Sequence, residues 1–159
     1  MSAIHIPRVQ AASVLQVLSS GRTTPCLLLC KNESGSDDEV VIKWRGALET
    51  KAKGLIAELL ASLLADDLGL PVAKPFLVEV EAGCIVGEGK PKLATIARDS
   101  VGLNFGSEKL PPGVGTWPKD KPIPVLLRSL AAEVFAFDLL IQNPRSASCG
   151  RRLKGLQNA

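Results

Sequence analysis

The sequence predicts an α+β fold, in which a small antiparallel sheet packs with a helix at residues 51–68 and a second helix follows at 125–142. Two observations lead to this prediction. Short apolar runs separated by polar turns are typical of strands. Two longer segments instead repeat large apolar residues at the spacing of one helix face. With 159 residues, the chain is long enough for one ordinary domain with its own core.

The first strands are predicted from their apolar content. Residues 26–30 (CLLLC) form a continuous apolar run of strand length, and residues 39–44 (EVVIKW) are rich in β-branched side chains. The polar stretch 32–38 between them predicts a β-hairpin with a long loop. Residues 12–20 fit a short strand or a turn of helix, and the pattern does not decide between them.

Further along the chain the strand signals become shorter. Residues 75–81 (PFLVEVE) predict a third strand, and residues 84–86 and 93–97 are candidates for short strands. Residues 99–124 are rich in glycine and proline, so we expect an irregular stretch there. A loop of this length in a compact domain is usually functional or connects two lobes.

Residues 51–68 give the strongest helix signal. Gly69 is suited to the C-terminal cap, and Pro71 prevents the helix from continuing. Large apolar residues at helical spacing form one wide stripe, which consists of Leu55, Ile56, Leu59, Leu60, Leu63, Leu64 and Leu68. The opposite side has small residues that permit close approach of another element, with one charge among Ala57, Glu58, Ala61, Ser62 and Ala65.

Residues 125–142 predict the second helix. Pro124 can occupy its first turn, since the missing N–H is not needed there. Its apolar residues are Leu126, Leu127, Leu130, Val134, Phe137 and Ile141.

Composition excludes several classes of function. Aromatic residues make up 4% of the chain and Tyr is absent, so a platform for stacking bases is not expected. No apolar run approaches the roughly 18 residues of a membrane span, and the N-terminal residues have no apolar signal region. We therefore expect a cytoplasmic protein with no membrane partner. The chain has four cysteines but a single histidine. This composition favours buried free thiols over a zinc site or disulfides.

The net charge of +3 comes from the last residues of the chain. Residues 145–159 contain four basic side chains and no acidic one. Their low apolar content predicts a disordered basic tail. The alternative is a tail that contacts an acidic partner, RNA or DNA.

The order of elements is loop, strand, turn, strand with a lysine, helix with a glutamate, and strand, which is the organisation of a protein-kinase N-lobe. ATP needs a cation near its α- and β-phosphates, and a flexible lysine needs a helix carboxylate to hold it. Here the pair is Lys43 in VVIKW and Glu58 in LIAELL. Backbone N–H groups of Gly21, Arg22 and Thr23 would face the phosphates. The alternative is that Lys43 is a solvated strand residue and Glu58 an exposed helix residue.

Longer segments around these residues resemble a known family. They are SSGRTTPCLLLC, EVVIKWRG, AELLASLLADDLGLPVAKPFLVEV, VGLNFGS and EVFAFDLLIQNP. The chain resembles the short branch of the HipA-like kinase family from roughly Val9 to Pro144. Two motifs are moderately specific when taken together: GLPVxxP after a leucine-rich helix, and FDxLIxN before a catalytic loop.

The resemblance implies a kinase-like N-lobe over residues 1–98, an inter-lobe connection over 99–124 and the first helix of a C-lobe over 125–144. It implies ATP as the cofactor, with Lys43 as the ATP lysine and Glu58 as its partner. The stretch 102–107 would lie near the hinge and the nucleotide cleft. The expected nucleotide-binding residues are therefore Gly21, Arg22, Thr23, Lys43, Glu58 and Asn104.

The chain departs from the family after the last motif. In such families FDxLIxN is followed at once by the catalytic Asp, and later by an Asn and a metal-binding Asp. Here Arg145 follows Pro144, and no Asp or Glu occurs after Asp138. We therefore expect no catalytic residue and no metal site. The abrupt change in composition at Arg145 suggests a frameshift or a truncated gene product.

The expected function is that of a truncated or degenerate HipA-like kinase, with weak ATP binding and no phosphotransfer. One alternative is an interaction or regulatory module that binds a protein partner. Another is a kinase half that a separate chain with the missing C-lobe completes.

Overall fold

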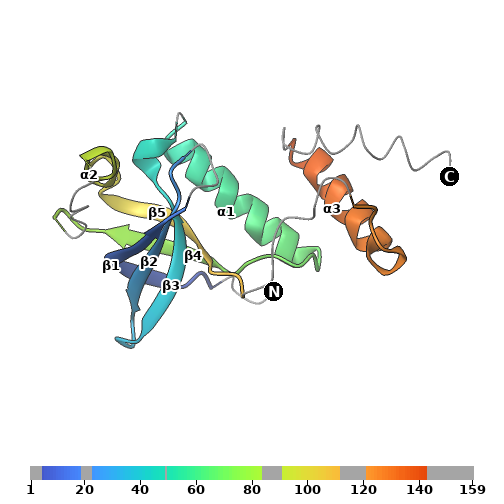
Figure 1. The fold of residues 1–159 in the computed structure, drawn as a ribbon, viewed down its shortest axis with the longest axis horizontal. Coiled ribbons are helices and arrows are strands. Elements are labelled where there is room, and N and C mark those ends of the chain that lie inside the picture. The colour runs from blue at the N-terminus through green and yellow to red at the C-terminus, as the bar shows by residue number, and fades with distance from the viewer. Residues whose placement is uncertain (1–4, 19–22, 49, 84–90, 112–120, 143–159) are drawn as a thin grey trace. The chain divides into compact units, whose positions relative to one another are not determined.

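Five strands close into a barrel in the order β1-β2-β3-β5-β4 (Figure 1). The strands are β1 Arg8–Val17, β2 Cys26–Asn32, β3 Asp37–Lys43, β4 Pro75–Val80 and β5 Gly102–Glu108. All neighbouring pairs are antiparallel except β1 and β4, which are parallel and complete the ring. The α+β class is thus confirmed, while the sheet is closed and contains one parallel pair.

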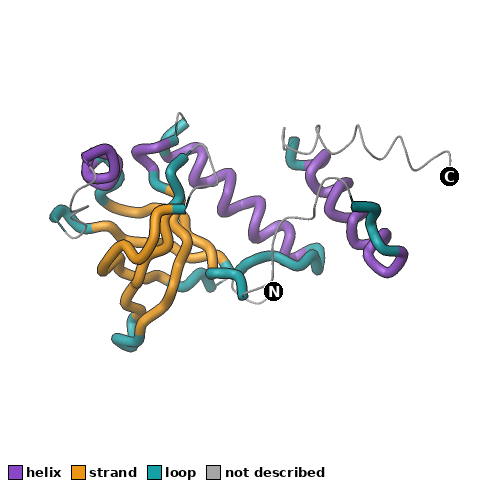
Figure 2. Tube along the Cα trace, viewed as in Figure 1, coloured by secondary structure: helices purple, strands orange, loops and turns teal. Residues whose placement is uncertain are grey.

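The computed structural model describes residues 5–18, 23–48, 50–83, 91–111 and 121–142. The chain forms two units, one of residues 1–63 and 73–112 and the other of residues 64–72 and 113–159. Helices and strands are coloured separately in Figure 2. The helices are α1 Ala52–Asp67, α2 Pro91–Arg98 and α3 Arg128–Leu140, with 3₁₀ turns at Arg45–Ala47 and Val125–Leu127.

The core of the first unit is the interior of the barrel. On β3 and just after it, the side chains of Val40, Ile42 and Trp44 are completely buried. Burial assigns Val40, Ile42 and Trp44 to the inner face of this strand. The Trp44 indole Nε1–H donates to Cys26 Sγ at 3.3 Å, which satisfies the one polar group that this large ring brings inside.

The β2–β3 hairpin forms as expected, but its strands extend to Asn32 and from Asp37, so its loop is short and not long as predicted. The Asn32 side chain organises it, because its Oδ1 accepts from the backbone N–H groups of Ser34 and Ser36 at 3.1 and 3.0 Å. Gly35 has a φ of +81°, a conformation that glycine adopts without a steric penalty. Residues 8–17 resolve the open alternative for the start of the chain in favour of a strand.

Two stretches differ from the sequence predictions. Residues 93–97 were expected to form a strand, and they lie in helix α2, where Leu93, Ile96 and Ala97 are buried at helical spacing. Pro91 occupies the first helical position, which suits its fixed φ. The stretch 99–124 was expected to be irregular, and it contains strand β5 between β3 and β4. The two glycines of β5, Gly102 and Gly106, favour a loop in a sequence-based prediction. Gly106 is nevertheless required by the packing inside the barrel.

Helix α1 matches the predicted helix to within one residue at each end. Gly69 has a φ of +72°, and the N–H groups of Gly69 and Leu70 donate to helix carbonyls, as expected for a C-terminal cap. The leucine stripe does not define the buried face. Leu55 and Ala65 are buried, whereas the exposed large side chains include Ile56, Leu60, Leu64 and Leu68. The small-residue side therefore contributes to the packed face.

In the second unit, helix α3 and the 3₁₀ turn before it cover most of the predicted helix 125–142, with Pro124 at the N-cap of the turn. No residue of α3 or of this turn is buried. Within the described ranges, no helix is long and apolar enough to cross a membrane. The strand expected at 84–86 and the tail expected at 145–159 lie outside the described residues.

Gly106 of β5 generates the first testable prediction. A Cβ at this position would lie 2.5 Å from Val40 Cγ1 and 2.7 Å from Val78 Cγ2, inside the barrel. Gly106→Ala should therefore lower the free energy of unfolding by about 1–3 kcal/mol, the usual cost of overpacking a core. Urea denaturation measures this.

The control for Gly106→Ala is Ser107→Ala, the next residue of β5, which is only partly buried. It should stay within about 0.5 kcal/mol of the parent, as most surface substitutions do. Equal stability of the two variants would contradict the packing of β5 against Val40 and Val78.

Candidate functional site

Lys43 and Glu58 form an ion pair on the outside of the barrel. Lys43 is the last residue of β3, and strand alternation turns it outward because Ile42 and Trp44 point inward. Its Nζ lies 2.5 Å from Glu58 Oε2 on helix α1. The expected ion pair is therefore confirmed, and the alternative of an unpartnered strand lysine is wrong. The two side chains are 34% and 42% exposed, so both remain in contact with solvent.

Three apolar residues lie around Lys43 in the sheet register, on the same side of the strands. Leu27 and Phe105 are buried there, at 7% and 4% exposure, and Val41 is partly exposed. Phe105 of β5 stands directly opposite Lys43, and the Lys43 ammonium lies 5.7 Å from the centre of its ring. Val41, two residues before Lys43, pairs with Leu27 of β2. A cation bordered by an aromatic ring and an aliphatic surface has the groups that a nucleotide needs, namely a charge for phosphate and an apolar wall for the base.

Strand alternation already places Val41 on the same face as Lys43. Leu27 was not predicted to lie near this pair. Phe105 falls in the stretch 102–107 that the resemblance places near the nucleotide cleft, but its strand was interpreted as an irregular loop. Its position opposite Lys43 depends on a long-range strand pairing that local patterns do not show.

The expected phosphate loop is described only in part. Gly21 and Arg22 lie outside the described residues. Thr23 and Thr24 lead into β2, and Thr24 has a φ of +49°. The loop therefore joins β1 to β2, two strands of the barrel that carries Lys43. A contact of Gly21, Arg22 or Thr23 with phosphate stays a prediction.

Asn104 is held inside the barrel. Its side chain is 2% exposed, and its Nδ2 donates to the carbonyl oxygens of Ser100 and Gly102 at 2.7 and 2.9 Å. Its Oδ1 accepts from the backbone N–H of Arg45 at 2.8 Å. The amide thus joins the end of α2, the start of β5 and the turn after β3. These contacts give Asn104 a structural role, and its expected contact with nucleotide stays a prediction.

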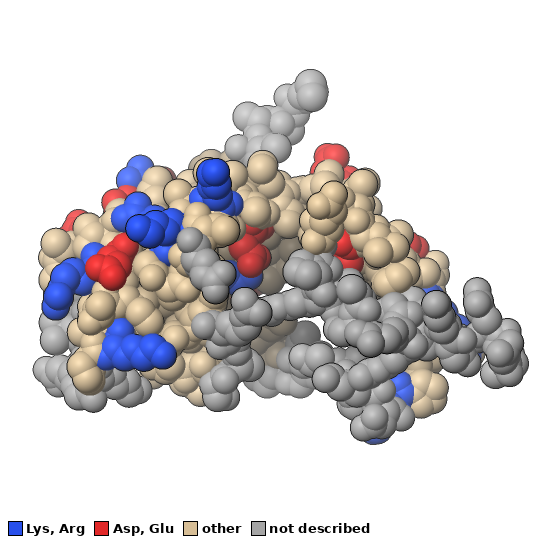
Figure 3. Space-filling view, turned by 90° about the horizontal axis from the view of Figure 1, so that it is seen from above, with Lys and Arg blue, Asp and Glu red and all other residues tan. Residues whose placement is uncertain are grey.

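Several surface charges of the first unit form local ion pairs. Lys31 and Asp37 form an ion pair at 2.5 Å, as do Lys109 and Glu39 at the same distance. Positive and negative side chains are interspersed on the face shown in Figure 3. Among the described residues, no group of three or more His, Cys, Asp or Glu side chains could hold a metal ion. The Lys43–Glu58 pair is set apart from the other pairs by its apolar neighbours.

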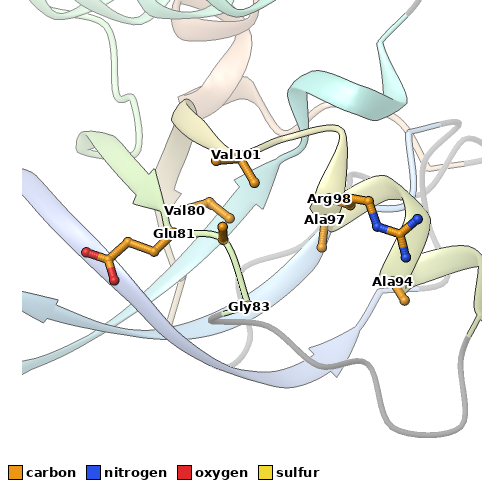
Figure 4. Close-up of a pocket in the computed structure, with 8 residues that line it drawn as sticks. Val80, Glu81, Gly83, Ala94, Ala97, Arg98 and Val101 are labelled. Atoms are coloured by element: carbon orange, nitrogen blue, oxygen red, sulfur yellow. The ribbon is translucent and has the colours of Figure 1, made fainter.

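A separate hollow of about 250 Å³ lies where β4 ends near α2 (Figure 4). Its walls include Val80, Ala94, Ala97 and Val101, with Glu81 and Arg98 at the margin. In Figure 4 the Glu81 carboxylate points away from the Arg98 guanidinium. The hollow thus presents short apolar side chains without converging polar groups, and we do not assign it a chemical function.

A family model described as HipA-like kinase matches residues 11–150, which is most of the chain. No curated protein and no solved structure matches the chain significantly.

The exposure of the Lys43–Glu58 pair predicts a small contribution to stability. In a double-mutant cycle of Lys43→Ala and Glu58→Ala, the coupling energy should be within about 1 kcal/mol, as for other solvent-exposed ion pairs. It should fall further as salt is added, because the side chains are accessible to counter-ions. Urea unfolding of the four proteins at low and high salt measures both quantities.

The same cycle on Lys31 and Asp37, an exposed pair at the same distance, is the matched control. A coupling energy above about 2 kcal/mol for Lys43 and Glu58 alone would show that their site is much drier than the 34% and 42% exposure of the two side chains indicates.

Proposed function

The chain belongs to the HipA-like kinase family, and we propose that its barrel and helix α1 bind ATP weakly, without transferring phosphate by themselves. The observation that carries this proposal is the contact between a strand lysine and a helix glutamate at 2.5 Å. The pair matters because the lysine ammonium is held in one place by a group that is itself fixed to a rigid helix.

In this proposal each residue has a defined part. The Lys43 ammonium pairs with the α- and β-phosphates, and Glu58 orients it. Val41, which is partly exposed, supplies apolar surface for the base, and the buried side chains of Leu27 and Phe105 lie beside it. Backbone N–H groups around Thr23 would approach the phosphates from the loop between β1 and β2.

The lack of phosphotransfer follows from the residues after α3. Phosphoryl transfer needs a carboxylate that positions the nucleophile and metal ions that neutralise developing charge. Residues 139–159 contain no Asp or Glu, and the family motif around Asp138 is not followed by the expected catalytic Asp. Nucleotide bound at Lys43 would thus lack both groups within this sequence.

The test is a titration of the protein with ATP, followed by two-dimensional NMR. We expect a dissociation constant on the order of 0.1–1 mM, which corresponds to about 4–5 kcal/mol of binding free energy. Lys43→Ala should weaken binding at least about tenfold, since charge-assisted hydrogen bonds contribute about 1.5–3 kcal/mol. Shifted resonances should include Leu27, Val41 and Phe105.

Lys31→Ala is the matched control, because it also removes a lysine from an exposed ion pair. Lys31 of β2 pairs with Asp37, which lies at the end of β3 opposite to Lys43. It should leave the affinity unchanged. Equal loss of affinity in both variants, or no shift at saturating ATP, would contradict the proposed site. Transfer of labelled phosphate that Lys43→Ala abolishes would contradict the second part of the proposal.

A second candidate function is a protein-interaction module. It is favoured by the large apolar side chains on the second unit, where Leu126 is 93% exposed and Leu140 is 66% exposed. Exposed apolar surface of this kind usually marks a contact with another protein. In this reading the partner covers α3 and the turn before it.

This second candidate predicts self-association of the isolated chain. Sedimentation velocity should show a weight that rises with concentration, because the apolar side chains gain by mutual burial. Replacing Leu126 and Leu140 with Gln should suppress the effect, whereas replacing the polar Ser129 of the same helix with Gln should not. A monomer at all concentrations would argue against an exposed contact surface on α3.

A further inference from the structure

We propose that a groove between α1 and strands β4 and β5 binds a small amphiphilic carboxylate, with the apolar part in the groove and the carboxylate on Arg45. The groove encloses about 250 Å³. It lies on the outside of the barrel, and all of its lining residues belong to the first unit. This site is distinct from the proposed nucleotide contacts, although the two share Phe105.

The walls of the groove are almost entirely apolar. Helix α1 contributes Leu55 and Leu59, and the strands contribute Leu77, Leu103 and Phe105. Leu103, the second residue of β5, is 43% exposed although it is a large apolar residue. A ligand that covers these side chains would gain free energy from the apolar area that it removes from water.

The size of the groove limits the ligand. A cavity of about 150 Å³ lined by apolar side chains accommodates benzene. The groove is larger, at about 250 Å³, and it is open to solvent. It therefore suits a bicyclic aromatic body or a short alkyl chain. A larger ligand would extend beyond the lining residues.

Arg45 gives the groove its preference for an anion. Its side chain lines the groove, and its Nη2 donates to the carbonyl oxygen of Val101. This contact holds the guanidinium in place while leaving other N–H groups of the fork for a ligand. A carboxylate is the group that a guanidinium fork matches best. The combination of one fixed cation and an apolar wall therefore selects an amphiphilic carboxylate over a neutral ligand.

The groove is also mechanically linked to the Lys43–Glu58 pair. Leu55 and Leu59 lie three residues before and one residue after Glu58 on α1, so a ligand that contacts them restrains the helix turn that carries Glu58. Phe105 contacts Lys43 on one side and lines the groove on the other. A ligand bridging the helix and the strands should hold Glu58 near Lys43 and thereby strengthen nucleotide binding. This coupling, unlike the groove itself, rests on the proposed function.

The direct test uses 2-naphthoate as the probe and 2-naphthamide as its neutral analogue, both titrated into the full chain and followed by NMR. We expect 2-naphthoate to bind with a dissociation constant of about 1 mM or lower, as is usual for a ligand of this size. Resonances of Leu55, Leu77 and Leu103 should shift. Arg45→Gln should weaken 2-naphthoate about tenfold and leave 2-naphthamide unchanged, because the lost contact is with the carboxylate.

Matched variants separate the groove from the rest of the surface. Arg98→Gln, which removes an arginine of the other hollow, should not change binding of 2-naphthoate. Ala52→Phe should block both probes, because Ala52 is exposed and lines the groove. Ala57→Phe, an equal change at an exposed position of α1 outside the groove, should not. Thermal unfolding confirms that each variant is folded.

Three outcomes would overturn the proposal. These are no shift at about 10 mM 2-naphthoate, shifts that Ala52→Phe does not abolish, and equal weakening of both probes by Arg45→Gln. The coupling is measured separately. In the presence of 2-naphthoate the dissociation constant for ATP should be several-fold lower, and this effect of 2-naphthoate should be absent in Lys43→Ala. Probe binding without ATP binding would contradict the proposed function and leave the groove established. Binding of both without coupling would contradict the mechanical link.

Discussion

The side-chain amide of Asn104 determines how strand β5 enters the barrel. Its three hydrogen bonds reach Ser100, Gly102 and the backbone N–H of Arg45, at 2.7, 2.9 and 2.8 Å. These backbone groups belong to the end of α2, the start of β5 and the residue that follows Trp44. The Ser100 contact is buried and the other two are partly buried, and a buried polar group that loses its partner costs about 1–3 kcal/mol. The contact therefore fixes β5 beside β3, and all the features of the outer face follow from that register.

Because the barrel is closed and filled, a ligand can bind only on its outer side. The interior is filled by side chains such as Trp44 and Ile42, and Gly106 is needed where the chain passes between Val40 and Val78. A filled small barrel has no room for a ligand inside. Functional side chains must therefore point outward. Helix α1 provides the second wall of that outer site, and it contacts the strands through side chains rather than through close backbone packing. This arrangement leaves both a solvated ion pair and an open groove.

The sequence predicts local features of this structure well and long-range features poorly. The helix at 51–68, the hairpin around Asn32 and the Lys43–Glu58 pair each depend on short-range patterns or on a known order of elements. Strand β5 was missed, because a segment with two glycines is usually predicted to be a loop. The reason for Gly106 appears only in the folded barrel, where Val40 and Val78 lie next to it. Helix α2 was read as a strand, since eight residues give a short apolar pattern that fits either period. The leucine stripe did not identify the buried face of α1, because a stripe indicates amphipathicity and does not say which neighbour is present.

The charge balance at the outer site explains why weak binding is the natural expectation. ATP brings several negative charges, and Lys43 is already paired with Glu58 at 2.5 Å. At about 4 Å in water, two unit charges interact by only about 1 kcal/mol, and Lys43 is 34% exposed, so solvent screens it. In a complete kinase site, metal ions held by carboxylates supply most of the neutralising charge. The residues after Asp138 provide no such carboxylate. In the proposed site the remaining attraction comes from one ammonium, backbone N–H groups and the apolar contact of the base with Val41, and we therefore expect weak binding of ATP without transfer of its phosphate.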